Sequence, residues 1–110
     1  MNIVGYDPLV SPETASSWGI KYLTLEEIWP IADYITVHTP LIPQTRNLIG
    51  TESLAACKPT VKIVNVARGG IVDEQALLKA LNDGTCGGAG LDVFDTEPPQ
   101  DLTLVQHPKV

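Results

Sequence analysis

The chain has 110 residues, with 7 basic and 13 acidic side chains that give a formal charge of −6 when both histidines are neutral. Nucleic-acid and anionic-membrane surfaces are bound by clustered lysines and arginines, so this balance argues against both kinds of partner. Apolar residues make up 44% of the chain, which is typical of a folded domain, and no apolar stretch approaches the roughly 18 residues of a membrane span. We therefore expect a soluble globular segment, either one domain or part of one.

The first residues and the two cysteines indicate the cell compartment. The N-terminus has neither the basic region nor the small-residue cleavage site of a secretory signal. Cys57 and Cys86 have no CxxC or metal-ligand spacing, which favours reduced, packed thiols over a disulfide framework or a metal site. The expectation is a cytoplasmic protein without a bound metal.

Along the first half of the chain, short apolar runs alternate with stretches of helical character. Pro8 ends the first run, because proline removes a backbone donor from a strand. Ser11 followed by Pro12 is typical of a helix start, and Thr24 with Glu27 has the spacing of a capping box. The predicted strands here are residues 3–6, 20–23 and 34–37, and the predicted helices are residues 12–18 and 25–31.

The second half of the chain continues this alternation. Two prolines within residues 38–43 predict a loop, and Pro98 with Pro99 predicts the end of regular structure. Asp73 is predicted to cap a helix whose apolar side chains share one face, and Gly84 to end it. The predicted helices are residues 51–58 and 74–82, and the predicted strands are residues 87–93 and residues 61–66, the latter buried on both faces. The whole pattern predicts an α/β fold, a parallel sheet with crossover helices.

Polar residues just after the apolar runs are the candidates for a ligand site, because a doubly wound sheet binds its ligand outside the carboxyl ends of its strands. Asp7 follows the first run and is placed to accept two hydrogen bonds from a ribose diol, which suits NAD and repels a 2′-phosphate. The simpler interpretation is an Asp-Pro turn. His38 is either a proton carrier or a loop residue that holds the backbone by a hydrogen bond, and we favour the loop role.

Two further candidates are Arg68 and Glu97. Arg68 stands between a predicted strand and two glycines, so its guanidinium is placed to pair with a substrate carboxylate while Gly69 and Gly70 admit a close approach. A surface arginine paired with an acid is an equal alternative. Glu97 precedes two prolines, and by itself a solvated acid is the simpler account. His107 lies near the C-terminal end, and we assign no chemistry to it.

Three stretches together carry more information than these single residues. They are residues 33–40 (DYITVHTP), residues 64–73 (VNVARGGIVD), and residues 90–94 (GLDVF) followed by 97–99 (EPP). In this order they resemble the nucleotide-binding domain of the D-isomer-specific 2-hydroxyacid dehydrogenases, and the resemblance covers nearly the whole chain. It implies a Rossmann-like parallel sheet with flanking helices, NAD as the cofactor and a small 2-hydroxyacid as the substrate.

Within this family, three shorter stretches narrow the expected substrate. Residues 5–8 (GYDP), 25–30 (LEEIWP) and 68–74 (RGGIVDE) are most similar to members that oxidise 3-phosphoglycerate to 3-phosphohydroxypyruvate with NAD. The alternatives are a dehydrogenase of the glycerate or lactate type and a non-catalytic, NAD-sensing protein of the corepressor kind. Members of the family pair through their nucleotide-binding domains, so the resemblance also implies a homo-oligomer, with apolar residues around Trp18 and Trp29 facing a partner.

The resemblance implies a role for each candidate residue. Asp7 would hold the adenosine ribose, and Asp92 would bind the nicotinamide carboxamide. Arg68 would orient the substrate carboxylate, and Glu97 would keep a catalytic histidine oriented and its pKa high enough to exchange the hydroxyl proton. The implied catalytic residues are thus Arg68 and Glu97, and the implied cofactor-binding set is Asp7, His38, Thr39, Pro40, Val66, Ala67, Arg68 and Asp92.

The sequence also departs from the family pattern, because it contains no G-x-G-x-x-G, the turn that holds a dinucleotide pyrophosphate. By the resemblance, residues 3–6 correspond to the family's second strand, so the first strand, the phosphate turn, the first helix, the catalytic histidine and the substrate domain are absent. We therefore interpret residues 1–110 as a partial NAD-binding domain that is inactive alone. In a sheet of order 3-2-1-4-5-6, loss of the first strand cuts the sheet between residues 3–6 and 34–37. The isolated chain is therefore predicted to be either poorly folded and aggregation-prone or paired again across the gap, and not to bind NAD tightly.

Overall fold

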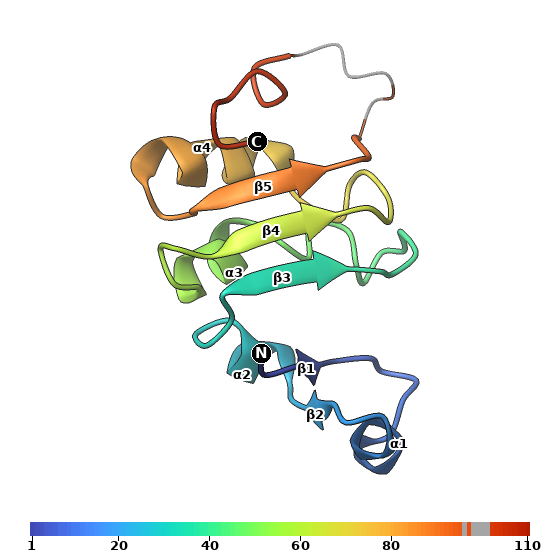
Figure 1. Ribbon diagram of the computed structural model, residues 1–110. Coiled ribbons are helices and arrows are strands. Elements are labelled where there is room, and N and C mark those ends of the chain that lie inside the picture. The colour runs from blue at the N-terminus through green and yellow to red at the C-terminus, as the bar shows by residue number, and fades with distance from the viewer. Residues whose placement is uncertain (96, 98–101) are drawn as a thin grey trace.

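A computed structural model describes residues 1–95, 97 and 102–110 of the chain, and it shows parallel strands alternating with helices (Figure 1). The strands are β1 (Val4–Gly5), β2 (Lys21–Tyr22), β3 (Tyr34–Val37), β4 (Lys62–Asn65) and β5 (Gly88–Leu91), and the helices are α1 (Pro12–Ser17), α2 (Leu25–Ile28), α3 (Thr51–Ala56) and α4 (Glu74–Asp83). Every strand pair is parallel, so the predicted α/β class is confirmed. The predicted end of regular structure at Pro98 and Pro99 lies outside the described residues.

The strands form two separate sheets. β1 pairs with β2, and β3, β4 and β5 pair in that order. Within the described residues no ladder joins β1 to β3, so the sheet is divided as predicted for one that lacks its central strand. The two strands, both fully described, have not paired with each other across the gap. On the opposite side, the outer edge of β5 is covered, because the Ala89 amide donates to the Lys109 carbonyl at 2.9 Å.

Short-range hydrogen bonds determine where the first two helices begin. The Ser11 hydroxyl accepts from the Thr14 amide at 3.1 Å at the start of α1. At α2, the Thr24 hydroxyl accepts from the Glu27 amide and the Glu27 carboxylate accepts from the Thr24 amide, which completes the predicted capping box. The bond from the Thr24 amide to the Glu27 carboxylate, and next a second one from the Thr24 hydroxyl, lower the pKa of Glu27. The helix ends at Ile28 rather than at the predicted residue 31, because Pro30 has no N–H to continue it.

Helix α4 is capped at both ends as the sequence predicts. One Asp73 carboxylate oxygen accepts from the amides of Gln75 and Ala76, at 3.1 and 3.2 Å. Gly84 takes the left-handed conformation, with φ of 77°, at the C-terminal end. The apolar face of the helix buries Leu77, Ala80 and Leu81.

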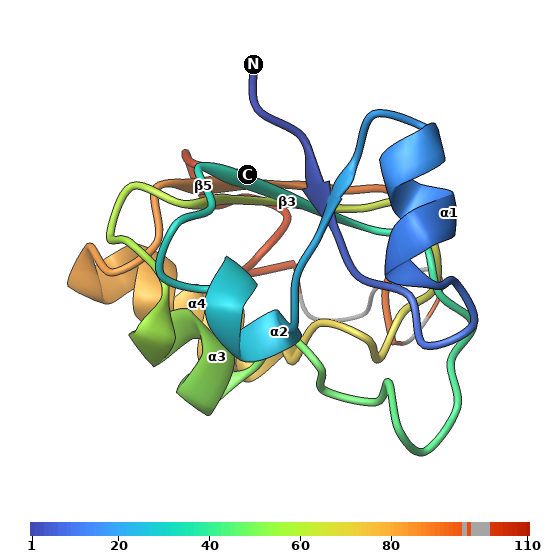
Figure 2. The same ribbon diagram turned by 90° about the horizontal axis from the view of Figure 1, so that it is seen from below.

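The core lies on one face of the three-stranded sheet. Figure 2 shows α2, α3 and α4 on the same side of the sheet, where Ile63 and Leu77 are completely buried. On the other face Tyr34 is 69% exposed, and the Lys62 ammonium lies 5.3 Å from the centre of its ring. The prediction that the strand of residues 61–66 is buried on both faces is therefore wrong. Burial alternates along β4, because the described helices cover one face of this sheet.

The two tryptophans and the two cysteines differ in their surroundings. Trp29 itself belongs to the buried core, whereas Trp18 is 62% exposed and Ile31, two residues after Trp29, is 50% exposed. A partner-facing surface around the two tryptophans stays a prediction. Both thiols are free, with Cys86 buried and Cys57 half-buried. Burial raises the pKa of Cys57 to about 11, and Cys86 nearby adds to the shift. Such a thiol is a poor nucleophile at neutral pH.

Among the described residues, no helix has both the length and the apolar character needed to cross a membrane.

We predict that Asp73→Ala destabilises the protein that carries this segment by about 1 kcal/mol, because α4 loses the acceptor for two of its first amides. Urea unfolding measures the loss. Asp73→Asn is the matched control, since its side-chain oxygen still accepts a hydrogen bond. Equal stability of the parent and the alanine variant would contradict the assignment of the cap.

Candidate functional site

The predicted site residues follow strands that all run in one direction. In Figure 1 the segments after β3, β4 and β5 leave the sheet on the same side, at the arrowheads. His38 follows β3, the Arg68 turn follows β4, and Asp92 follows β5. The parallel topology therefore brings three of the candidate segments to one edge of the sheet.

Asp7 lies two residues beyond β1 and is exposed. Its Oδ1 atom accepts from the Leu9 amide at 2.8 Å, and its backbone carbonyl accepts from the Tyr22 hydroxyl at 3.2 Å. This is the turn that the simpler interpretation of the sequence predicts. The second carboxylate oxygen has no hydrogen bond within the described residues, so the turn leaves one acceptor available to a ribose hydroxyl.

The segment after β3 contains the next three candidates. His38 is exposed, and its Nε2 atom lies 2.9 Å from the Thr36 hydroxyl, so the contact joins two side chains and does not hold the backbone. The Pro40 carbonyl accepts from the Thr45 hydroxyl at 2.6 Å, which orders the turn that follows. Among the described side chains, the Thr39 hydroxyl is the buried polar group without a hydrogen-bond partner.

This unsatisfied hydroxyl tests whether the segment suits a polar cofactor. A buried hydroxyl without a partner is unfavourable by about 1–3 kcal/mol, and a hydrogen-bonding group of a ligand would relieve that cost. The free carboxylate oxygen of Asp7 and the Thr39 hydroxyl both match the hydroxyl-rich ribose of a dinucleotide. The residues present fit such a group.

Asn65, which the sequence analysis did not single out, shapes the turn after β4. Its side chain is buried, with 2% exposure; the amide nitrogen donates to the Arg68 carbonyl at 2.9 Å, and the amide oxygen accepts from the Ala67 amide at 3.1 Å. The signal in the sequence was a polar residue that interrupts an apolar strand. One side chain thus holds both ends of the turn, and Val66 within it is 49% exposed.

Arg68 is exposed at this turn. Its Nη1 atom donates to the Ala67 carbonyl at 3.0 Å. No carboxylate of residues 1–95, 97 or 102–110 lies within ion-pair distance of the guanidinium. The alternative of a surface ion pair is therefore not found in the described part of the chain, and the rest of the guanidinium is available to an anion.

The two glycines after Arg68 are required by packing within the protein itself. A Cβ atom on Gly69 would overlap the Phe94 carbonyl, and Gly70 has φ of 88°. A Cβ on Gly70 would also lie 2.9 Å from the Arg46 guanidinium. Contrary to the sequence argument, the close approach that these glycines permit is made by the chain, so they are not evidence for a ligand.

The segment after β5 contains the last two candidates. The Asp92 amide donates to the Asn65 carbonyl at 3.0 Å, which continues the pairing of β4 and β5, and the Asp92 side chain is exposed. Glu97 is also exposed. The structure thus places Asp92 beside the turn that carries Arg68.

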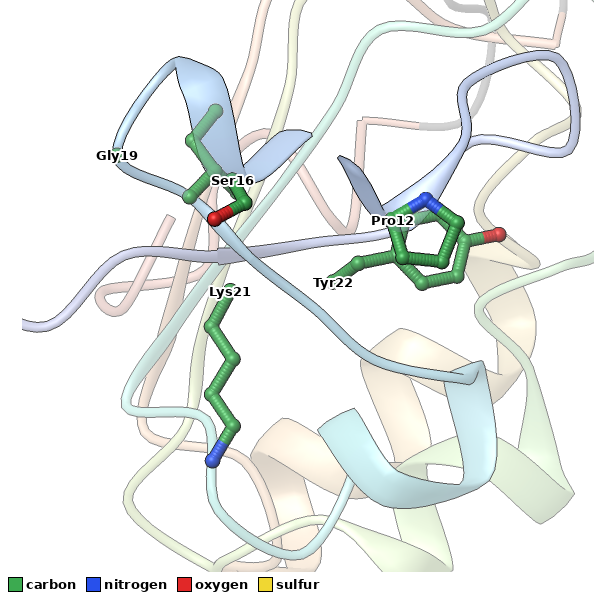
Figure 3. Close-up of a pocket in the computed structure, with 6 residues that line it drawn as sticks. Pro12, Ser16, Gly19, Lys21 and Tyr22 are labelled. Atoms are coloured by element: carbon green, nitrogen blue, oxygen red, sulfur yellow. The ribbon is translucent and has the colours of Figure 1, made fainter. Parts of the chain in front are cut away.

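One hollow of the described surface, of about 380 Å³, lies between α1 and β2, with Lys21 on one side and Pro12 and Tyr22 on the other (Figure 3). None of the candidate residues lines it. Another, of about 240 Å³, lies beside the Arg68 turn and is lined in part by Arg46 and Glu74.

These features define a class of protein. Parallel strands with crossover helices and exposed polar residues at their carboxyl ends are the layout of a nucleotide-binding α/β domain. The chain belongs to the family described as D-isomer specific 2-hydroxyacid dehydrogenase, NAD binding domain, whose model matches residues 1–110. The resemblance, the Rossmann-like fold and NAD as the cofactor of the family, all predicted from the sequence, are thereby confirmed.

Known proteins of this family share the sequence and the fold. The D-3-phosphoglycerate dehydrogenase of Rattus norvegicus is 59% identical over 110 residues, which are 100% of this chain and 21% of the relative. A glyoxylate reductase from Paecilomyes thermophila superposes with a TM-score of 0.88 at 36% identity, over 99% of this chain and 33% of that one. An NAD-complexed D-isomer specific 2-hydroxyacid dehydrogenase from Lactobacillus delbrueckii ssp. bulgaricus superposes with a TM-score of 0.85 at 36% identity, over 99% and 37%. The chain spans about a fifth of the length of the curated relatives that it matches.

We predict that Asn65→Leu destabilises the protein by about 1–3 kcal/mol, because it leaves the Ala67 amide and the Arg68 carbonyl without a partner. Thermal and urea unfolding measure the change. Asn2→Leu makes the same substitution at an exposed position and serves as the control. If both variants lost the same small amount of stability, Asn65 would not hold the turn.

Proposed function

We propose that this chain is part of the NAD-binding domain of a D-3-phosphoglycerate dehydrogenase, which oxidises 3-phosphoglycerate to 3-phosphohydroxypyruvate at the entry to serine biosynthesis. The observation that carries the proposal is 59% identity, over all 110 residues, to a relative of that name. The activity is proposed for a protein that contains this segment together with a glycine-rich turn and a catalytic histidine. Residues 1–110 alone form a partial NAD-binding domain and are proposed to be inactive.

The chain's own residues supply the cofactor contacts in this proposal. When bound, NAD accepts the hydride that leaves the substrate carbon. The free oxygen of Asp7 accepts from the adenosine ribose, and His38, Thr39 and Pro40 line the adenine side. Residues 66–68 run beneath the nicotinamide ribose, and the exposed Asp92 carboxylate accepts from the carboxamide.

Two residues act on the substrate side. Arg68 has guanidinium nitrogens without a described partner, and its planar, two-pronged group matches a substrate carboxylate. Glu97 is proposed to hold the catalytic histidine, which lies outside this sequence, and a carboxylate beside an imidazole raises the pKa of that imidazole. The histidine then accepts the hydroxyl proton during oxidation.

The surroundings of the site in the whole protein form part of the proposal. We also propose a homo-oligomer, in which the exposed Trp18 faces another copy of the protein. The free, partly buried cysteines support a cytoplasmic location.

We predict that the protein containing this segment prefers NAD to NADP. The Asp7 carboxylate repels a 2′-phosphate, and the next residue is Pro8 rather than a cation. Steady-state kinetics measure kcat/KM with each cofactor, and Asp7→Asn should lower the ratio of kcat/KM with NAD to kcat/KM with NADP. A higher kcat/KM with NADP would remove the proposed role of Asp7.

We predict that Arg68→Lys lowers kcat/KM for 3-phosphoglycerate by at least tenfold, corresponding to about 1.5–3 kcal/mol, because an ammonium cannot make the two-pronged contact to a carboxylate. Kinetics with 3-phosphoglycerate, D-glycerate and D-lactate measure both the loss and the substrate class. Lys21→Arg, which changes an exposed cation on β2, is the control. Unchanged kinetics in Arg68→Lys would return this residue to a surface role.

A further inference from the structure

The segment that follows β5 is attached to the rest of the chain at Asp95. The Asp95 amide donates to the Glu74 carboxylate at 2.7 Å, and the Asp95 carboxylate forms an ion pair with the Arg46 guanidinium at 3.5 Å. The Gly69 backbone packs directly against Phe94 and Asp95. Residues from three distant parts of the sequence thus meet at one position, two residues before Glu97.

The Glu74 side chain is not needed to cap the helix that it begins. Glu74 is the first residue of α4, but Asp73 already caps that helix. A carboxylate in the first turn of a helix is favourable without any further contact. Here the Glu74 side chain instead accepts a short, charge-assisted hydrogen bond from another segment.

The ion pair between Arg46 and Asp95 also contributes little to stability. Both side chains are 53% exposed, and exposed ion pairs are weak because water screens them. It nevertheless joins the Asp95 side chain to Arg46, while the Glu74 carboxylate binds the Asp95 backbone amide. The two contacts thus hold Asp95 both by its side chain and by its backbone amide.

We propose that Glu74 and Arg46 are positioning residues, which hold Asp95 so that Glu97 is directed toward its catalytic partner beside the Arg68 turn. This inference rests on the proposed function, in which Glu97 raises the pKa of a catalytic histidine. A carboxylate affects an imidazole in this way only at hydrogen-bond distance, and small displacements of a catalytic group lower the rate strongly. Loss of the Asp95 contacts therefore reproduces part of the loss of Glu97.

The test uses the complete dehydrogenase and the pH profile of kcat/KM. Glu97→Gln should lower the apparent pKa of the acidic limb, because the histidine loses its carboxylate partner. Glu74→Ala should move the same limb in the same direction and lower kcat at least fivefold. Glu74→Gln retains an oxygen acceptor for the Asp95 amide and should recover most of this loss. Arg46→Ala should have a smaller effect of the same kind.

A double variant and a neighbouring control separate positioning from general stability. If Glu74 acts through Glu97, adding Glu74→Ala to Glu97→Gln should cause no further shift of the acidic limb. Gln75→Ala changes the next, exposed residue of α4 and should leave the profile unchanged. A Glu74→Ala variant with lower thermal stability and the parent's pH profile would overturn the inference.

The same experiment distinguishes this inference from the proposed function. If the acidic limb of the pH profile shifts in Glu97→Gln but not in Glu74→Ala, only the positioning role of Glu74 is refuted. A parent enzyme that oxidises no D-2-hydroxyacid overturns the proposed function and the inference together. An active parent whose Glu97→Gln variant keeps the same pH profile overturns the role of Glu97 and the inference, but not the dehydrogenase activity. Hydrogen exchange of the Asp95 amide gives a readout besides activity, and exchange at the parent's rate in Glu74→Ala also overturns the positioning role.

Discussion

The packing of helices against one face of the three-stranded sheet is the constraint on which the site depends. Ile63 of β4 and Leu77 and Leu81 of α4 lie in the same buried cluster and are almost inaccessible to water. A crossover helix between parallel strands returns the chain to the same end of the sheet each time. As a result every strand ends at the same edge, and the polar residues that follow are brought together although they are far apart in the sequence.

At that edge, a few side chains convert the general layout into a defined surface. Asn65 uses both atoms of its amide to hold the turn that carries Arg68, and its carbonyl pairs with the Asp92 amide. Gly69 then allows the segment after β5 to lie directly on this turn. The exposed Arg68 in the loop after β4 and the exposed Asp92 in the loop after β5 are therefore held by loops that pack against each other.

The parts of the fold that depend on neighbouring residues could be predicted from the sequence. The capping box of Thr24 with Glu27 and the Asp73 cap need only a spacing of two or three positions, and both are present. Burial of β4 on both faces could not be judged in this way, because it depends on which helices cover the sheet. The burial of Trp29 could not be judged from the sequence for a similar reason, since a large apolar side chain has no local signal that separates core from surface.

In the candidate site, too, features set by the local sequence could be predicted, and contacts between distant residues could not. Arg68 is a candidate because it follows a strand, which is a rule of topology, whereas Asp92 is a candidate through the resemblance to the family. The contacts of Arg46 and Glu74 with Asp95 join residues separated by more than twenty positions, and no local sequence pattern predicts them. The need for the two glycines was likewise visible only once the segment after β5 was seen against them.

The unpaired edge of β3 has a consequence for how this segment behaves in solution. The C-terminal residues cover the outer edge of β5, whereas within the described residues no strand lies along the outer edge of β3, and Tyr34 and Thr36 on the open face of that strand are exposed. Backbone groups on such an edge bond to water, and another extended chain can replace that water. When the 110 residues are separated from other chain segments, their self-association is therefore governed by concentration, with β3 as the strand that offers the longest open edge.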